Sequence, residues 1–541
     1  MTGRLLLTCL LLAPCALPQS KNPTGSLEGV ILDPQGKPRA GVDVRLTRGN
    51  AEATTGPAGE FTLPNLAPGP NELSIGFRPS SGVAFCQRAV TILPGQVTKV
   101  RFSLAASATL SGRVVDEYDE PAPHLDLGLY LSEYASGALR TFRRYGARTD
   151  DEGNYRFDGV SPDLPYQLLV LPHEYARLSI ALSDAPTDPR LRRPAPVPTY
   201  YPGATDPAGA ELITLHSGEH RDGVNLRVRR APSYCVEGQV PPAASANSIV
   251  EVYESHINFG ISIHLGSTSL PRQGKIAPGG GFRFCDLHPG EYHLRAVQGD
   301  PNKPTAVAIH TFSVRDRDAL DVLLHPAPRF SIPVEISWAS GLPPKEPIAQ
   351  KVRLGLRSLT RSFAAFYNTE RIDLPVAGAT TGMIDGFLGD EYHHSLFGFS
   401  GRVYVKEVVY GNDTITHTAL RPASTATPIR ITLGHDGALL KVRVVTREKQ
   451  PVSNASVILI PAGYLSEAEL GTVLLLGLTD GDGNYTAPSA IAPGRYRLVV
   501  HNEPLMQPLS PPQVQQFAGL KGREVNAEPG ADLNLELGPV E

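Results

Sequence analysis

Near the N-terminus the chain reads Gly29-Val30-Ile31-Leu32-Asp33-Pro34-Gln35-Gly36-Lys37-Pro38, and Gly41-Val42-Asp43-Val44-Arg45-Leu46 follows. It continues with Thr55-Gly56-Pro57-Ala58-Gly59-Glu60-Phe61-Thr62-Leu63 and closes with Leu66-Ala67-Pro68-Gly69. Short apolar runs between Gly and Pro residues predict β-strands joined by tight turns. We expect a strand, a Pro/Gly turn, an alternating strand, a Gly-containing hairpin, an aromatic strand and a Pro-Gly turn.

The same order of motifs returns three more times. The copies are Gly112 to Asp116 with Thr149 to Phe157 and Val160-Ser161-Pro162; Gly238 to Val240 with Gly281 to Tyr292; and Thr479 to Tyr485 with Ile491 to Tyr496. Four copies of one motif order along the chain indicate tandem modules, because a sequence pattern that recurs in this way marks a repeated structural unit.

Each module also ends on an alternating strand. Val100, Phe102 and Leu104 point to one side while the polar residues between them point to the other, and three later runs do the same: Val224-Leu226-Val228, Ile429-Ile431-Leu433 and Leu533-Leu535-Leu537. Period-two alternation predicts one buried and one solvated face, as in a two-sheet sandwich.

The sequence therefore predicts an all-β chain of tandem antiparallel β-sandwich domains, which resemble Ig-like or transthyretin-like sandwiches. We expect a signal peptide over 1–20 and sandwiches over 21–105 (unit 1), 106–232 (unit 2), 233–326 (unit 3), 327–436 (unit 4) and 437–541 (unit 5). Unit 2 carries a Pro-rich excursion over 185–210, and unit 4 is degenerate, with only Gly401 to Val405 similar to the closing motif. Short helices are expected within 466–475 and 512–520.

These motifs resemble the carboxypeptidase regulatory-like module, a transthyretin-like sandwich related to the B-type repeats of bacterial adhesins. The resemblance lies in the openings at Gly29 and Gly112 and in the Gly-x-aromatic and Pro-Gly closings, and it covers units 1, 2, 3 and 5. The layout, with Tyr200 to Gly203 and Tyr404 to Lys406, is similar to exported acidobacterial proteins. The resemblance implies a carbohydrate-binding-like fold but no peptidase activity, since fold alone does not assign function.

Length and composition agree with this reading. The chain has 541 residues, 52 Gly, 50 Pro and a formal net charge of −4. A chain of that length is too long to fold around a single hydrophobic core. Its net charge gives no reason to expect a nucleic-acid partner.

The first residues have the features of a secretory signal peptide. Arg4 precedes the apolar run Leu5 to Leu12, and small residues and Pro follow, with cleavage expected between Cys15 and Ser20. Leu12-Ala13-Pro14-Cys15 faintly resembles a lipoprotein acylation site, but Pro beside the Cys fits that reaction poorly. We therefore expect a mature chain without a transmembrane segment that is secreted, periplasmic or at the cell surface.

Three cysteines follow the leader. Cys235 and Cys285 fall on strands of one predicted domain, and an oxidising compartment allows them to form a structural disulfide. The alternative is a pair of buried thiols that fill core space. Cys86 would lie outside this pair, in a core.

Two polar motifs have a possible metal chemistry. His216-Ser217-Gly218-Glu219-His220 fits the zinc pattern H-x-x-E-H, but that pattern needs a helix, and Ser-Gly here occupies the turn position of Pro94-Gly95-Gln96 and Pro529-Gly530-Ala531. Asp480-x-Asp482-x-Asn484 and Asp150-x-Glu152-x-Asn154 have the spacing of calcium-loop oxygens but lack the later Gly and Glu ligands. We interpret the first motif as a plain hairpin between two strands and the second as hairpin turns, and we expect no metal and no cofactor.

Aromatic residues are the remaining candidates for ligand binding. Tyr200 and Tyr201 in the excursion form a possible ligand platform, the alternative being that they pack the excursion onto a neighbour. Trp338 is in phase with Ile332, Val334 and Ile336 and is expected in a core. The adhesin resemblance also suggests a Lys441–Asn534 isopeptide bond, but the alternation of both strands places these side chains in solvent.

We find no catalytic motif and expect no enzymatic activity. The leading hypothesis is a secreted or cell-surface multi-domain structural or interaction protein, with an unknown envelope or extracellular protein or glycan as partner. The alternative is a carbohydrate- or peptide-binding accessory protein. The modules would form either a rod or a compact assembly.

Overall fold

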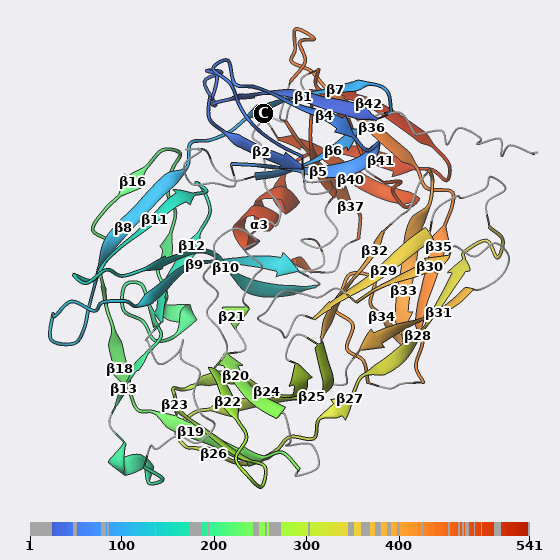
Figure 1. Ribbon diagram of the computed structural model, residues 1–541. Helices are drawn as coiled ribbons and strands as arrows, with labels where there is room; N and C mark the ends of the chain where they lie inside the picture. Colours follow the sequence, from blue (N-terminus) through green and yellow to red (C-terminus); the bar gives the residue numbers. More distant parts are fainter. Residues whose placement is uncertain are drawn as a thin grey trace, which may run out of the picture.

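The computed structural model consists of β-sandwiches (Figure 1). It describes residues 24–46, 51–76, 83, 86–92, 94–135, 137–171, 186–192, 194–241, 248–254, 257–258, 272–300, 303–343, 351–358, 368–373, 380–386, 391–397, 401–423, 426–452, 455–463, 466–467, 470, 475–480, 482–487, 489–501 and 510–538. The predicted signal peptide lies outside these residues.

Units 1 and 2 contain the first eighteen strands. Unit 1 has β1 (Gly25–Leu32), β2 (Asp43–Leu46), β3 (Glu52–Thr54), β4 (Glu60–Leu66), β5 (Gly69–Ile75), β6 (Cys86–Ile92) and β7 (Val97–Ser103). Unit 2 has β8 (Ala108–Val115), β9 (Asp126–Ala135), β10 (Ala138–Arg148), β11 (Asn154–Val160), β12 (Tyr166–Leu171), β13 (Ala195–Val197), β14 (Thr199–Tyr200), β15 (Leu212–Ile213), β16 (His220–Arg221), β17 (Leu226–Arg227) and β18 (Arg229–Ala231).

Units 3, 4 and 5 contain the other strands. Unit 3 has β19 (Tyr234–Gln239), β20 (Ser248–Glu254), β21 (Ile257–Asn258), β22 (Arg272–Lys275), β23 (Gly281–Leu287), β24 (Gly290–Asp300), β25 (Lys303–Val314) and β26 (Ala319–Leu323). β27 (Ala327–Pro328) follows, and unit 4 has β28 (Phe330–Trp338), β29 (Lys351–Ser358), β30 (Asn368–Asp373), β31 (Thr380–Gly386), β32 (Tyr392–Phe397), β33 (Tyr404–Tyr410), β34 (Asp413–Thr414) and β35 (Ile429–Gly434). Unit 5 has β36 (Leu439–Val444), β37 (Ser456–Pro461), β38 (Leu475–Leu478), β39 (Asn484–Thr486), β40 (Gly494–His501), α3 (Pro511–Gly519), β41 (Arg523–Ala527) and β42 (Asp532–Leu537).

One sheet of each unit follows a single rule: the opening strand lies between an antiparallel strand, which carries aromatic residues in units 1, 2, 3 and 5, and a parallel closing strand. The strand orders are β4-β1-β7, β11-β8-β16 with β17 also on β8, β23-β19-β26, β31-β28-β35-β33-β34 and β39-β36-β42. The degenerate unit 4 thus keeps the arrangement, although its β33 lies in this sheet instead of at the edge of the other one.

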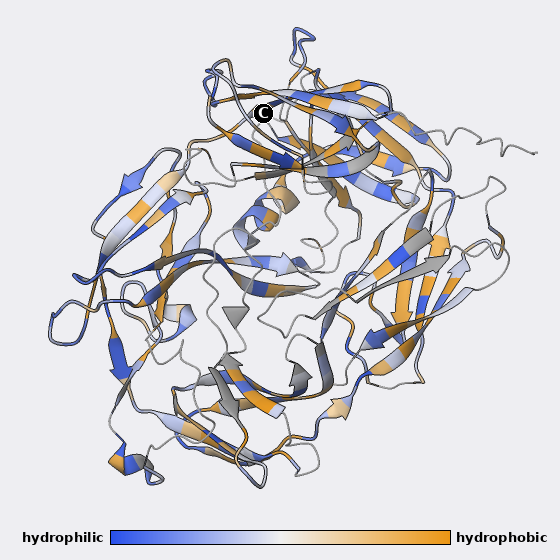
Figure 2. Cartoon of the chain, in the orientation of Figure 1, coloured by the Kyte–Doolittle hydropathy of each residue, from blue (hydrophilic) through white to orange (hydrophobic). Residues whose placement is uncertain are grey.

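The second sheet of each unit packs across the core from the first. The orders are β3-β2-β5-β6, β14-β12-β9-β10-β21 with β15 on β12, β22-β20-β24-β25-β27, β30-β29-β32 and β38-β37-β40-β41. β27, at the predicted start of unit 4, therefore pairs within unit 3's sheet. Apolar and polar residues alternate along the strands (Figure 2), and each unit has its own buried apolar cluster.

The prediction that a hairpin of two paired strands precedes each aromatic strand is wrong. The turns at Gly59, Gly153, Gly280 and Gly483 do not join paired strands: each carries the chain from the second sheet to the first. The glycine carbonyl accepts a hydrogen bond from the end of the opening strand, as Gly153 does from the Val114 N–H at 2.8 Å. The turn chemistry was read correctly, but the local pattern does not say which strand each flank pairs with.

Several smaller predictions are confirmed. Trp338 lies in the unit 4 core with Ile332, Val334 and Ile336, and Cys86 is buried in unit 1. A helix forms at Pro511–Gly519, near the expected segment, with Val514 and Phe517 buried. Among the residues that the structure describes, no helix combines the length and apolar character needed to cross a membrane.

The units are arranged around a common centre, with unit 1 next to unit 5, whose β6 and β38 are in contact (Figure 1). The β9–β10 hairpin of unit 2, here called the central hairpin, contacts three other units. Thr141 on β10 pairs in parallel with Ile257 of unit 3, Arg140 forms an ion pair at 2.8 Å with Glu391 of unit 4, and Tyr134 donates to Glu467 of unit 5 at 2.9 Å. The arrangement is a compact assembly and not a rod.

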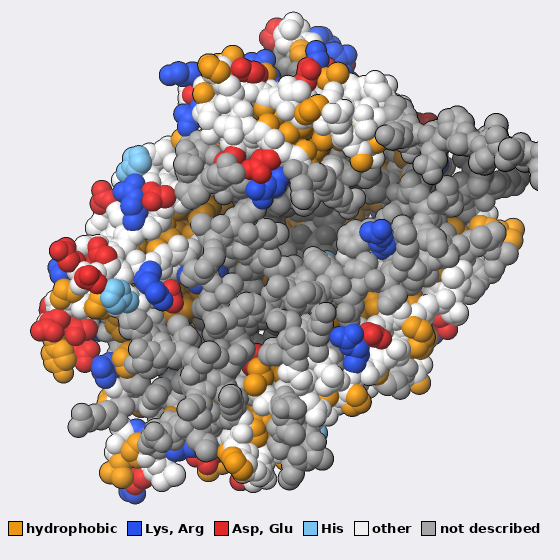
Figure 3. Space-filling model, viewed as in Figure 1, with side chains coloured by type: hydrophobic (Ala, Val, Ile, Leu, Met, Phe, Trp, Pro, Cys, Tyr) orange, Lys and Arg blue, Asp and Glu red, His pale blue; other side chains and the backbone are white. Residues whose placement is uncertain are grey.

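The visible surface carries charges of both signs. In the view of Figure 3, acidic and basic side chains are interspersed over the described residues of unit 2 and do not separate into large patches of one sign.

Candidate functional site

The structure joins Cys235 and Cys285 in a disulfide. Cys235 lies on β19 and Cys285 on the neighbouring antiparallel strand β23, at a point where the register of the two strands shifts. Both residues are buried. The bond therefore links two adjacent strands of the first sheet of unit 3, near its junction with unit 2.

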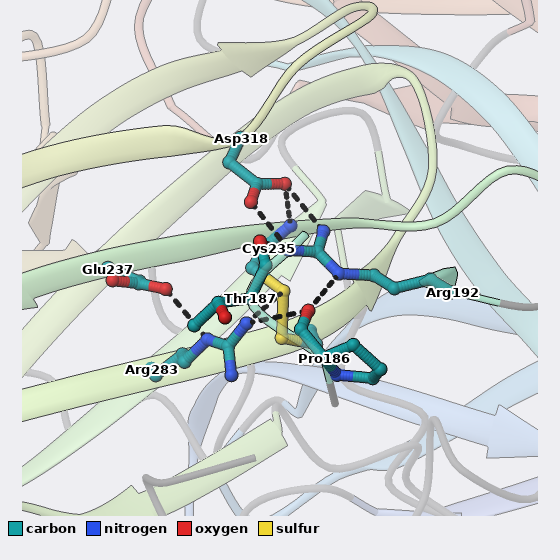
Figure 4. The surroundings of a disulfide bond; sticks show 8 residues. Pro186, Thr187, Arg192, Cys235, Glu237, Arg283 and Asp318 are labelled. Carbon is teal, nitrogen blue, oxygen red and sulfur yellow. Dashed lines mark hydrogen bonds and ion pairs between the residues drawn. A yellow bond between two sulfur atoms is a disulfide. The ribbon is translucent and has the colours of Figure 1, made fainter. Parts of the chain in front are cut away.

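The excursion of unit 2 reaches this disulfide through Arg192 (Figure 4). The two guanidinium NH₂ groups of Arg192 each lie 2.7 Å from an oxygen of Asp318, in the turn before β26. The remaining donors hold the excursion itself: Nε donates to the Pro186 carbonyl at 2.7 Å, and one NH₂ to the Thr187 carbonyl at 3.1 Å. Asp318 also accepts the backbone N–H of Cys235 at 2.8 Å.

A second arginine contacts the same groups. Arg283 on β23 donates to the Pro186 carbonyl at 3.2 Å and lies 3.5 Å from the sulfur of Cys235. Its Nε forms an ion pair with Glu237 at 2.7 Å. Figure 4 shows Pro186 and Thr187 among the residues around the disulfide. The excursion is therefore linked to the disulfide through Arg283 on β23, and it contacts the turn before β26 through Arg192.

The electrostatics of Asp318 suit an ionised carboxylate. Burial by itself would raise its pKa, but the hydrogen bonds from Arg192 and Cys235, with the charges of Arg192 and Arg283, outweigh burial and lower the pKa. The side chains of Arg192 and Asp318 are 3% and 10% exposed. A buried carboxylate with several charge-assisted partners stays charged, so the pair is ionic.

Tyr200 and Tyr201 do not form the exposed platform that the sequence suggested. Tyr200 is 3% exposed and packs with Tyr130, Leu169 and Leu171, because β14 pairs with β12. Tyr201, which precedes Pro202 through a cis peptide bond, packs against the unit 2 core. A ligand-stacking ring needs an open face, and Tyr200 has none, so the structure favours the packing alternative.

The His216 to His220 string is a turn, but it is not a hairpin. β15 before it pairs with β12 of the second sheet and β16 after it pairs with β8 of the first. Glu219 accepts the His216 N–H and an Arg221 donor, each at 2.7 Å, and these bonds lower its pKa. The Glu219 carboxylate thus closes the turn, and Gly218 takes a φ of 74°. Gly95 and Gly530, at 67° and 73°, make the corresponding turns in units 1 and 5.

The two acidic loops also serve their own backbone. Asp150 Oδ1 accepts from the N–H groups of Glu152 and Asn154 at 3.0 and 2.8 Å. Asp480 accepts in the same way from Asp482 and Asn484 at 2.9 and 2.8 Å. Among the described residues, no group of three or more His, Cys, Asp or Glu side chains could hold a metal ion.

The proposed isopeptide partners lie on adjacent strands. Lys441 on β36 is opposite Asn534 on β42 in the parallel register, and both residues are exposed. Their solvent-facing position agrees with the alternation seen in the sequence. An amide-forming reaction between these groups needs a dry environment, which this face does not offer.

A buried threonine escaped the sequence reading. Thr55, Thr149 and Thr479 each precede the turn into the aromatic strand and each bridge two backbone groups. Thr479 Oγ1 accepts from the Ala455 N–H at 2.9 Å and donates to the Val452 carbonyl at 2.7 Å. Thr55 and Thr149 make the same two bonds. The sequence signal was a threonine at the same position in three copies of the repeat, directly before the four-residue turn that ends in Gly59, Gly153 or Gly483.

A comparison of the sequence with protein-family models matches residues 26–105 to the carboxypeptidase regulatory-like domain. No curated protein matches the chain. Solved structures that are similar in part include the Bacillus anthracis TIE protein (13% identity, 56% of this chain, TM-score 0.16), of which the match spans about half, 51%.

Two pilins are similar at the same level. The minor pilin GBS52 of Streptococcus agalactiae has 14% identity over 39% of this chain and 97% of its own, with a TM-score of 0.21. The RrgB pilus protein of Streptococcus pneumoniae has 7% identity over 80% of this chain and 98% of its own, with a TM-score of 0.13. The matched residues 26–105 are those of the unit 1 sandwich, so unit 1 is the part of the chain that is similar to the carboxypeptidase regulatory-like domain.

Proposed function

We propose that the protein is a secreted or cell-surface, non-catalytic structural and interaction protein made of five sandwiches with the ranges given above, after a signal peptide at 1–20. The observation that carries this proposal is that the acidic side chains of the polar motifs form hydrogen bonds to the backbone of their own turns. The carboxylates of Glu219, Asp150 and Asp480 each accept backbone N–H groups within their own turn. Groups committed to backbone turns are not available as general bases or metal ligands.

The contacts between units support the structural part of the proposal. The side chains of Arg140 and Glu391 are 10% and 18% exposed, although they come from units 2 and 4. Side chains of unit 5 cover Tyr134 of the central hairpin. Buried contacts between domains favour a fixed arrangement over free motion, and a fixed arrangement suits a scaffold that presents its outer loops.

Export is tested with the full chain carrying a C-terminal epitope in a bacterial host. We expect the wild-type protein outside the cytoplasm with a mature mass that lacks about the first 20 residues. Leu7→Arg with Leu10→Arg breaks the apolar core of the leader and should leave the full-length protein in the cytoplasm. Equal cytoplasmic retention of wild type and variant would overturn the location.

The interaction part is tested on a glycan array and by pull-down from an envelope fraction. Specific retention of an envelope protein, lost when that fraction is treated with protease, supports a protein-binding scaffold. Binding to a defined glycan that survives this treatment would replace it with the carbohydrate-binding alternative. Turnover of any compound by the purified protein would contradict the non-catalytic assignment.

A further inference from the structure

The feature that goes beyond this function is the contact between the 186–192 segment of unit 2 and the disulfide of unit 3. We call this segment the latch. It runs from Pro186 to Arg192 and contains a short 3₁₀ turn at Pro189–Leu191. Nothing in the sandwich pattern of either unit requires this contact, because the latch belongs to the excursion and to neither sheet of unit 2.

Arg192 holds the latch in two directions. Its bonds to the Pro186 and Thr187 carbonyls close the segment on itself, and its paired bonds to Asp318 attach the segment to unit 3. Planar, bidentate guanidinium–carboxylate contacts fix orientation as well as position. Loss of Arg192 would leave the Asp318 carboxylate buried without its main partner, which disfavours the docked state strongly.

Asp318 and Arg283 connect the latch to the disulfide. Asp318 accepts the N–H of Cys235, so the carboxylate that holds Arg192 also fixes the backbone of one bonded cysteine. Arg283 donates to Pro186 and approaches the Cys235 sulfur, so it spans the latch and the bond. The disulfide in turn ties β19, which carries Cys235, to β23, which carries Arg283.

We propose that the latch shields the Cys235–Cys285 bond from thiols, and that the bond in turn keeps the latch docked, so that reduction and undocking favour each other. Thiol–disulfide exchange requires a thiolate to reach a sulfur atom. Both cysteines are buried, and the Arg283 side chain, which donates to the Pro186 carbonyl of the latch, lies 3.5 Å from the Cys235 sulfur (Figure 4). Undocking of the latch removes this cover, and the same opening frees Arg283 from Pro186.

The reaction is a two-electron reduction by a dithiol. One thiolate of the reductant attacks a cysteine sulfur, the S–S bond breaks, and a mixed disulfide forms. The cysteine that was not attacked leaves as a thiolate in this step, and the second thiol of the reductant then attacks the reductant's own sulfur in the mixed disulfide and releases the attacked cysteine. Two protein thiols and one cyclic disulfide result, so the two electrons and two protons come from the dithiol.

The test measures native-state reduction of the full chain by dithiothreitol, followed by alkylation of the released cysteines and mass spectrometry. We expect Arg192→Ala to reduce about tenfold faster or more than wild type, because access to sulfur limits the rate. The matched control is Arg190→Ala: Arg190 lies in the same segment, is 88% exposed and pairs with Asp188. That control should reduce at the wild-type rate.

Hydrogen exchange provides the second measurement. Arg192→Ala should raise exchange in the latch while peptides from β24 keep wild-type protection, which shows that unit 3 is folded. Cys235→Ala with Cys285→Ala should raise latch exchange as well, because the linkage is reciprocal. Equal reduction rates for wild type and Arg192→Ala, with latch exchange raised, would overturn the shielding role.

If Arg192→Ala unfolds unit 3, Arg192→Lys replaces it, since this variant keeps the charge but loses the paired contact. An intermediate reduction rate for Arg192→Lys supports the proposal. A wild-type rate together with a loosened latch contradicts it. Export does not enter this experiment, so failure here leaves the proposed function untouched.

Discussion

Units 3 and 5 have the same strand arrangement but secure it differently. In both, the opening strand lies between an antiparallel aromatic strand and a parallel closing strand. Unit 5 holds the turn into the aromatic strand with buried Thr479. Gly280 and Gly483 make the same backbone bonds, so the residue of unit 3 that corresponds to Thr479 is Ile276, which has no hydroxyl group. Unit 3 has the Cys235–Cys285 disulfide as its side-chain link. The backbone arrangement thus does not depend on one particular fastening.

The largest effect is expected from the disulfide. Cys235→Ala with Cys285→Ala removes a cross-link that spans 50 residues, and the loop-entropy relation gives a loss of about 4 kcal/mol in the unfolding free energy of unit 3. Hydrogen exchange of β24 measures it, and β40 in unit 5 is the internal reference. A loss confined to unit 5, or shared equally, would contradict the comparison.

Thr479→Val should rank second. The substitution keeps the shape but leaves the Ala455 N–H and the Val452 carbonyl without this partner, at a cost of about 2–3 kcal/mol in unit 5. Denaturant-dependent exchange of β40 measures the change. Thr486→Val, at an exposed position on β39, is the control and should shift stability by less than about 0.5 kcal/mol.

A tyrosine hydroxyl provides a third test because both units use it. Tyr292 donates to the His288 carbonyl at 2.9 Å, and Tyr496 donates to the Ala492 carbonyl at 2.7 Å. We expect Tyr292→Phe to cost about 1–2 kcal/mol and Tyr496→Phe about 1 kcal/mol, since Tyr292 is the more buried. Thermal unfolding followed by exchange in each unit checks the order, which a larger loss for Tyr496→Phe would reverse.

Asp480→Ala should have the smallest effect. Asp480 accepts two backbone N–H groups in an exposed turn, and unit 3 has Ala277 at the same turn position. We expect a loss of about 0.5–1 kcal/mol in unit 5 and no stabilisation of the wild type by added calcium. A clear rise in melting temperature with calcium would show that the loop binds the ion.

Much of each sandwich follows from sequence alone. Alternation placed Ile429, Ile431 and Leu433 in a core, and Gly and Pro marked the turns, because both signals act over a few residues. The pairing of the strands on either side of a turn depends on residues that are distant in the chain, so a short stretch of sequence does not reveal it. The turn at Gly59 looks the same whether its strands pair with each other or, as here, with strands of different sheets.

The site was harder to predict because its members are distant in the chain. Cys235 and Cys285 share a unit, and simple pairing brings them together. Arg192 and Asp318 are 126 residues apart in different units, and no periodicity links an excursion to a turn. Tyr200 looked exposed beside Pro202, but Tyr130 and Leu169, which bury it, belong to strands that the sequence did not assign to the same sheet.

The central hairpin sets an order for assembly during synthesis. Arg140 must wait for Glu391, 251 residues later, and Tyr134 must wait for Glu467, 333 residues later. Units 1 and 2, which have core clusters of their own, precede unit 4 in the chain, but this hairpin remains uncovered by unit 5 until unit 5 has emerged. A chain that stalls or is cut before that point would expose an unfinished docking surface, which is the kind of surface that chaperones and proteases recognise.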